Sequence, residues 1–371
     1  MLFIKVDELK PGMRLGKPIY NKNGVLLYDR DTRISMQTIV GIRNFGLMGL
    51  YILEPAEPVP PMSDEDINFE RFQTMSVFSI REDLDLISKG KKDKGLDWLC
   101  SLIIKNYANL SHKINFIQSL RSTDDFVYKH SINVAILAAI IGGRMSMSPG
   151  RIKKLVKAAL LHECGRVQIK EIPDEEEEDE FKQLTKVKTM EIVKNHADID
   201  EDIERIILYL HELYIGDGEA PVLEAAKSNI NAAILYVADA YDRMTAMKSY
   251  EEPTSEVKAL RALLNDPEEY DPVVVQALIN GINVLYPGVC VELTEHIKGL
   301  VIIENVLDIF KPWVLSFYDN KLYDLSDPSS CGELELVDIM KTMDNRIKLD
   351  PELLNEYNEH PDEVGAESTE K

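Results

Sequence analysis

The sequence predicts a mainly α-helical protein with a small β-rich unit at each end. Apolar residues recur every three or four positions from about residue 64 to 264, which is the period of amphipathic helices. Short β-favouring runs separated by turn signals occupy residues 1–54 and again residues 286–319, as in small antiparallel sheets. The length of 371 residues exceeds that of one ordinary domain, so we expect two or three folded units.

Composition and charge exclude several classes of protein. Hydrophobic residues make up 45% and charged residues 29% of the chain, which excludes a fibre or a wholly disordered polymer. The chain has 42 Lys and Arg against 64 Asp and Glu, a net charge of −22. Because such a field repels polyanions, we expect no nucleic acid polymer as a partner.

Cysteine usage and hydropathy favour a cytoplasmic protein that is not inserted in a membrane. The four cysteines are scattered and form no C-x-x-C pair, so neither a disulfide framework nor a thiolate zinc site is predicted. The amino-terminal sequence MLFIKVDELK does not resemble a signal peptide. The longest apolar run, Ile132–Gly143, is too short to span a bilayer.

The amino-terminal third is predicted as a β-rich module followed by a helical connector. In residues 1–54 the turn signals KPGM and NKNG separate short strands. The proline-rich segment EPAEPVPP ends this module and predicts a stiff linker over residues 55–64. A helical connector is then expected over residues 65–121, with an apolar stripe from Leu96 to Ile117. Bundle packing is the commoner fate of such a stripe, although a homodimer seam is the alternative.

Three further apolar stripes predict helices that share one core. They lie within residues 152–160, 203–210 and 230–241. Beyond them a small β appendage is expected over residues 284–325, and a mostly polar tail over residues 326–371.

Histidines and acidic residues beside these stripes form a candidate metal site. Four histidines lie in helical segments, and Asp239 is embedded in the apolar run ILYVADAYD, where an unpaired carboxylate is costly. A single such histidine is more often a hydrogen-bonded core residue. Taken together, imidazoles and carboxylates without thiolates fit Fe, Mn, Ni, Co or Zn better than calcium. The candidate residues are His130, His162, Glu163, His196, His211 and Asp239.

The order of these motifs adds a resemblance to a known family. HSINVA, ALLHECGR, NHADI, LYLHE and VADAYDRMTAMKSY resemble, in that order, the HD-GYP family of metal-dependent phosphohydrolases. The likeness covers about residues 122–283. The flanking sequences DELKPGMRLGKPIYNKNGVLL and YPGVCVELTEHIKGLVI resemble the modules that often surround such domains.

The resemblance implies an HD-type helical bundle that hydrolyses cyclic di-GMP, a second messenger in bacterial signalling, with two metal ions. By position, a first metal is held by His130, His162, Glu163 and Asp239. A second uses Glu163 with His196 and His211. Glu163 and Arg166 carry over as catalytic residues. The substrate-binding residues carried over are Arg166, Asp242, Thr245, Lys248 and Tyr250.

Four positions depart from the family pattern. Glu163 replaces the aspartate of the HD pair, Leu210 replaces one histidine of a pair, and Arg166 replaces a lysine. The G-Y-P loop reads Gly218-Glu219-Ala220, and an acidic run at residues 174–180 precedes it. Because Leu210 removes an imidazole, we expect one metal to be firmly bound and the second to be weak or absent, with slow turnover.

Two functions are compatible with this pattern. The first is a cyclic di-GMP phosphodiesterase with an impaired second metal site. The second is a catalytically inactive module that senses a cyclic dinucleotide or serves as a scaffold for signalling proteins. The first is favoured because the metal-site positions other than Leu210 are still His, Glu or Asp.

Overall fold

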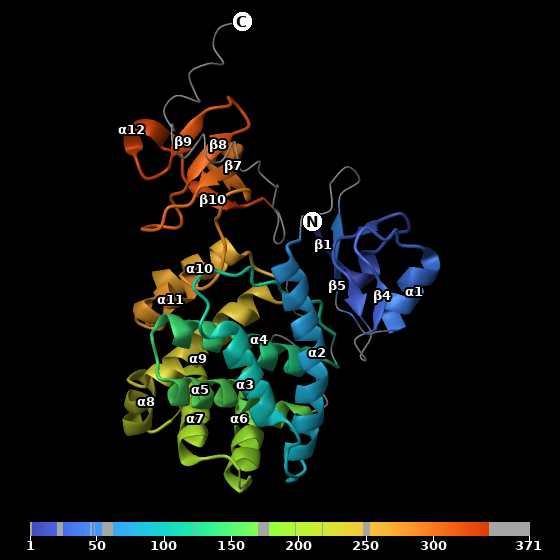
Figure 1. Cartoon of the computed structure of the whole chain (residues 1–371), viewed down its shortest axis with the longest axis vertical. Coiled ribbons are helices and arrows are strands. Elements are labelled where there is room, and N and C mark those ends of the chain that lie inside the picture. Colours follow the sequence, from blue (N-terminus) through green and yellow to red (C-terminus); the bar gives the residue numbers. More distant parts are fainter. Residues whose placement is uncertain are drawn as a thin grey trace, which may run out of the picture.

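The computed structural model describes residues 2–20, 25–44, 47, 49–53, 62–122, 124–169, 178–196, 198–216, 218–247 and 253–340. It has a helical bundle with a small β-containing unit at each end of the chain (Figure 1). The predicted fold class is therefore confirmed.

The amino-terminal module is a small sheet covered by one helix. Its strands β1, β5 and β2 pair antiparallel in the order β1-β5-β2, and β3 pairs with β4. Every residue of β5 is buried, so this strand is the centre of the module's core. The elements are β1 (Leu2–Lys5), β2 (Arg14–Leu15), β3 (Ile19–Tyr20), β4 (Leu26–Tyr28), α1 (Met36–Asn44) and β5 (Gly49–Leu53). The predicted NKNG turn lies outside the described residues.

The bundle is built around helix α4, which is buried along most of its length and packs on α2, α3, α5, α9 and α11. Its length and composition would allow a membrane span, but 78% of its most apolar window is buried inside the bundle. Packing against other helices therefore accounts for its apolar sequence. The helices are α2 (Asp64–Ile87), α3 (Leu96–Tyr107), α4 (Phe126–Arg144), α5 (Pro149–Leu161), α6 (Glu178–Asn195), α7 (Glu201–Ile215), α8 (Ala220–Lys227), α9 (Ile230–Thr245), α10 (Glu256–Asn265) and α11 (Pro272–Ile279).

Local capping fixes the start of two of the helices that carry candidate ligands, α7 and α9. Asp200 accepts hydrogen bonds from the backbone at the start of α7, and Asn229 does the same for α9. Helix α7 ends at Ile215 and is capped by Gly216, whose φ of 68° favours glycine. The stripes predicted for α5, α7 and α9 are buried in the main core, as expected.

The stripe from Leu96 to Ile117 belongs to a helix only in its first part. Helix α3 ends at Tyr107, and the chain then crosses α4 so closely that a Cβ on Gly143 would lie 1.7 Å from the carbonyl oxygen of Ala108. Ile114 and Ile117 are buried in the same core without being helical. The apolar stripe from Leu96 onward therefore packs against the bundle, as predicted, but the helix ends at Tyr107 and the rest of the stripe is not helical.

The carboxy-terminal unit is a five-stranded antiparallel sheet in the order β10-β6-β7-β8-β9. The sequence predicts a polar tail from residue 326 onward, but α12 and β10 lie in that segment. The carboxy-terminal unit therefore continues past residue 325. Lys258 of α10 binds Asp338 of β10 at 2.9 Å, which ties the sheet to the bundle. The elements are β6 (Cys290–Leu293), β7 (Lys298–Ile303), β8 (Trp313–Ser316), β9 (Leu322–Asp324), α12 (Pro328–Cys331) and β10 (Leu336–Ile339). Residues 341–371 lie outside the described residues.

Candidate metal centre

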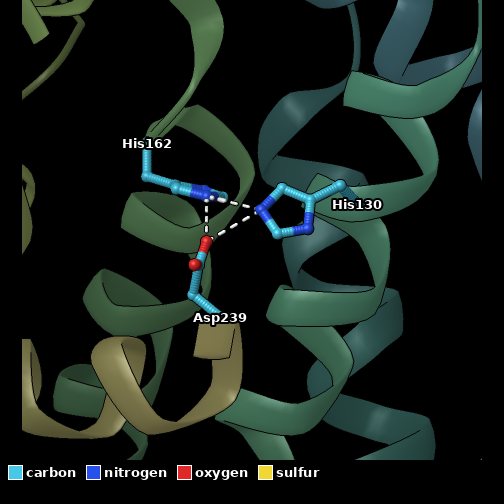
Figure 2. A group of neighbouring side chains, drawn as sticks. All are labelled: His130, His162 and Asp239. Carbon is cyan, nitrogen blue, oxygen red and sulfur yellow. Dashed lines mark hydrogen bonds and ion pairs between the residues drawn. The ribbon is translucent and has the colours of Figure 1, made fainter. Parts of the chain in front are cut away.

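Three of the predicted ligands converge inside the bundle. Figure 2 shows His130 from α4, His162 from the end of α5 and Asp239 from α9 pointing toward one another. The Nε2 atoms of His130 and His162 lie 2.8 and 3.0 Å from Oδ1 of Asp239, and 3.2 Å from each other. All three side chains are at most 1% exposed. They offer two nitrogen donors and one oxygen donor, all within 4.8 Å of one another.

Hydrogen bonds on the far side of each ring determine which nitrogen faces the cluster. Nδ1 of His130 donates to Asp242 at 2.7 Å, and Nδ1 of His162 donates to the carbonyl of Ala159 at 2.7 Å. Because an ionised carboxylate and a carbonyl can only accept, each Nδ1 carries the hydrogen. In the neutral rings, both Nε2 lone pairs therefore point toward Asp239, as metal-binding histidines require.

This arrangement fits a cation. Two lone pairs and a carboxylate oxygen within about 3 Å repel one another unless a proton or a metal ion lies between them. Burial opposes the charged form of His130, but the carboxylates of Asp239 and Glu163 outweigh it, and the pKa of His130 is raised. The N₂O donor set is one that divalent transition metals prefer.

Asp242 lies behind His130 in a buried polar network. Its carboxylate accepts from Arg121 at 2.7 Å, from Gln118 at 2.9 Å and from Asn133 at 2.8 Å. Burial would raise the pKa of Asp242, but the Arg121 guanidinium lowers it below its usual range. This carboxylate is therefore ionised and serves to position His130.

The predicted substrate-binding residues are not all on an open surface. Asp242 is 0% and Thr245 2% exposed, and Thr245 donates to the carbonyl of Tyr241. Both contact protein groups in this structure. Lys248 and Tyr250 lie outside the described residues.

Glu163 borders the cluster and is held by two arginines. Its Oε2 lies 3.9 Å from Nε2 of His130 and accepts from Nη1 of Arg166 at 3.1 Å. Its Oε1 accepts from Arg243, which also donates from Nε to Oδ2 of Asp239 at 2.5 Å. Burial would raise the pKa of Glu163 and of Asp239, but Arg243 holds both well below the usual range. Both carboxylates are therefore ionised.

Close backbone packing positions the HECGR segment that carries Glu163 and Arg166. A Cβ on Gly165 would lie 2.3 Å from the backbone nitrogen of Thr189 on α6. The backbone N–H of Gly165 also donates to the Thr189 hydroxyl at 3.1 Å. The Arg166 guanidinium lies 4.7 Å from the Phe126 ring centre and 4.9 Å from that of Phe181, so stacking helps to hold it.

The residues predicted for a second metal are not brought together. The ring of His196 faces the connection between α2 and α3, where its Nε2 donates to the carbonyl of Lys91 at 3.1 Å. Nε2 of His211 donates to the carbonyl of His162 at 2.9 Å, and burial lowers the pKa of His211 to about 4. Within the described part of the chain, the one set of three potential ligands this close is His130, His162 and Asp239. Leu210 is completely buried in the core, as predicted.

The remaining predicted features border on undescribed chain. Gly218 and Ala220 lie at the start of α8, and a Cβ on Gly218 would meet the Glu212 carboxylate at 2.1 Å. Most of the acidic run at residues 174–180 lies outside the described residues.

Sequence reasoning missed three residues of the site. Arg243 and Tyr214 both bind Asp239, and Arg121 binds Asp242. The one local signal was the spacing of Arg243, which lies four residues after Asp239 and so on the same face of α9. The other two contacts depend on tertiary packing.

Comparison with known proteins identifies the class of this domain. Residues 127–244 match the family model of the HD domain, and the three converging side chains all fall within that range. This stretch, about a third of the chain, is similar to the HD domain, and the divalent metal that such a domain implies fits the donor set of these three side chains.

Three curated relatives carry the same functional name. One is the cyclic di-GMP phosphodiesterase PA4108 of Pseudomonas aeruginosa, 20% identical over 54% of this chain and 50% of the relative. Another is a cyclic di-GMP phosphodiesterase of Thermotoga maritima, 26% identical over 45% of this chain and 47% of the relative. The third is the cyclic di-GMP phosphodiesterase PdeB of Borreliella burgdorferi, 24% identical over 54% of this chain and 55% of the relative. The resemblance seen in the motifs is thus confirmed, and the chain spans about half the length of these relatives.

Among solved structures, the chain is similar to Bd1817, an HDG"Y"P protein from Bdellovibrio bacteriovorus. The TM-score is 0.46 at 15% identity, covering 75% of this chain and 97% of the other.

Proposed function

We propose that this chain is a metal-dependent phosphodiesterase that hydrolyses cyclic di-GMP. The observation that carries the proposal is the convergence of His130, His162 and Asp239 within 4.8 Å of one another, inside the HD domain. The functional name shared by the three relatives supports cyclic di-GMP as the substrate.

His130, His162 and Asp239 would hold a divalent cation, which is Fe, Mn, Ni, Co or Zn by its donor set. When bound, such an ion supplies a Lewis acid and lowers the pKa of a coordinated water toward neutrality. The protein's own contribution is to orient both rings from Nδ1 and to keep Asp239 ionised. Because these side chains are already oriented, the site would bind a metal ion without rearranging them.

Arg166 and Arg243 would bind the phosphodiester. Their side chains are 17% and 29% exposed, so each arginine is partly open to solvent beside the cluster. A guanidinium can donate two hydrogen bonds to non-bridging phosphate oxygens. Glu163 accepts from both arginines and so fixes the distance between them.

The experiment is incubation of the full chain with cyclic di-GMP under anaerobic conditions, with Mn²⁺ or Fe²⁺ and with chelator. Linear and mononucleotide products are separated by chromatography. Metal-dependent product that disappears in Asp239→Asn supports the proposal. Asp7→Asn, an exposed position far from the site, is the matched control and keeps wild-type turnover.

A second candidate function is a catalytically inactive module that binds a cyclic dinucleotide as a sensor or scaffold. It is favoured by one observation, that within the described residues neither His196 nor His211 belongs to a cluster of three potential ligands, so the described ligands fall short of two complete metal sites. Binding of cyclic di-GMP by the metal-loaded chain without any product would establish this alternative and refute the phosphodiesterase.

A further inference from the structure

The two oxygens of Asp239 face different partners. Oδ1 faces Nε2 of His130 and Nε2 of His162. Oδ2 accepts from Nε of Arg243 at 2.5 Å and from the Tyr214 hydroxyl. One carboxylate oxygen of Asp239 therefore faces the two histidine nitrogens, and the other faces the Arg243 guanidinium.

Arg243 joins Asp239 to the second carboxylate of the site. Its Nη2 donates to Oε1 of Glu163, a side chain only 5% exposed. A single guanidinium thus bridges two buried carboxylates that come from different helical segments, α9 and the end of α5. In two-metal sites the ions lie about 3.5–4 Å apart, so a second ion beside the His130, His162 and Asp239 set would compete with Arg243 for these same carboxylates.

The charges of the cluster are already balanced. Glu163 and Asp239 contribute two negative charges, and Arg166 and Arg243 contribute two positive charges at hydrogen-bonding distance. The Arg243 guanidinium also packs over the Tyr214 ring, whose centre lies 5.6 Å from the guanidinium carbon. A second divalent ion would have to displace this guanidinium or approach it closely, and like charges at such distances repel strongly.

We propose that Arg243 is a built-in cation that takes the place of a second metal ion, so that the chain binds one divalent ion, through His130, His162 and Asp239. This inference rests on the metal site of the proposed function. It assigns the bridging of Glu163 and Asp239 to a side chain rather than to a metal.

The test is titration of the metal-free full chain with Mn²⁺, measured by calorimetry and by metal analysis after gel filtration. The wild type should bind one ion. Arg243→Ala should bind a second ion at Glu163 and Asp239, or bind the first roughly tenfold more tightly or better, because a nearby positive charge has been removed. Arg243→Lys keeps the charge and should bind one ion. Arg205→Ala, an exposed arginine on α7, is the control and should match the wild type.

Two ions bound by the wild type would overturn the inference. So would an Arg243→Ala chain with the same number of ions and the same affinity as the wild type. If Arg243→Ala fails to fold, Arg243→Gln retains a hydrogen-bond donor without the charge, and the same expectations apply. The titration contains no substrate, so its result does not depend on catalytic activity. Two bound ions would overturn the inference even if the chain is an active phosphodiesterase. One bound ion would support it even if the chain is inactive.

Discussion

The carboxylate of Asp242 accepts a hydrogen bond from Nδ1 of His130 at 2.7 Å, and it is at the same time the partner of the completely buried Arg121. The Asp242 side chain therefore both orients the candidate metal ligand His130 and neutralises the buried Arg121. The link makes metal binding depend on a residue that is not among the three converging donors.

Replacing Asp242 with Asn is expected to weaken both folding and metal binding. The free energy of unfolding should fall by about 3–5 kcal/mol, because Arg121 loses its ionic partner inside the core. Affinity for Mn²⁺ should fall about 10- to 100-fold, as is usual when the residue that orients a metal-binding histidine is changed. Urea unfolding and calorimetric titration measure the two effects. Unchanged Mn²⁺ affinity in a folded variant would show that Asp242 does not position His130.

Leu210→His is expected to destabilise the chain without completing a second metal site. An imidazole in place of this fully buried side chain should cost about 1–3 kcal/mol, because its polar atoms lose water. Mn²⁺ stoichiometry should remain at one ion while Arg243 is present. Thermal unfolding and metal analysis check the two parts. A second tightly bound ion in Leu210→His alone would mean that the missing imidazole, not Arg243, limits the stoichiometry.

The metal-free chain should lose stability as the pH falls from about 6.5 to 4, in part through His211. Burial lowers the pKa of His211 to about 4 in the folded state, so in this window the unfolded chain binds the proton and the folded chain does not. The unfolded state is therefore favoured at lower pH, by up to about 3 kcal/mol. His211→Asn should lose less stability over the same window. Parallel pH profiles of wild type and variant would contradict this assignment.

Lys17 links the amino-terminal module to the buried polar network around Asp242, and its replacement should lower the free energy of unfolding. Its buried Nζ donates to the carbonyl of Gln118 at 2.6 Å, and the Gln118 side chain donates to Asp242. Lys17→Met should lower the free energy of unfolding by about 1–3 kcal/mol, because a buried carbonyl loses its donor. Urea unfolding beside the exposed control Lys10→Met measures the difference. Equal stabilities for the two variants would show that the contact contributes nothing.

The features that could be predicted from the sequence are those that depend on local periodicity. The stripes of α5, α7 and α9 predicted the core, and the apolar surroundings of His130, His162 and Asp239 indicated that these residues needed a partner. The predicted set of Glu163, His196 and His211 is not assembled, since among the described residues only His130, His162 and Asp239 offer three ligand atoms within 4.8 Å of one another. The partners that His196 and His211 have instead, the carbonyls of Lys91 and His162, are brought near them only by folding.

Other features depend on contacts between distant segments. Directly after α3 ends at Tyr107, the backbone at Ala108 passes close to Gly143 of α4, and no pattern within α3 indicates this crossing. The hydrogen bond from the Tyr214 hydroxyl of α7 to Asp239 of α9 likewise joins separate helices. Asn133 lies within the apolar run of α4, and its amide donates to Asp242, a contact that joins α4 to α9.

The most direct measurement is anomalous diffraction at the Mn absorption edge from crystals of the full chain grown with Mn²⁺. We predict one anomalous peak per chain, about 2.0–2.2 Å from Nε2 of His130, Nε2 of His162 and Oδ1 of Asp239, with the Arg243 guanidinium still bridging Asp239 and Glu163. Two peaks separated by about 3.5–4 Å, with Arg243 displaced, would contradict the account, as would the absence of any peak at these three side chains.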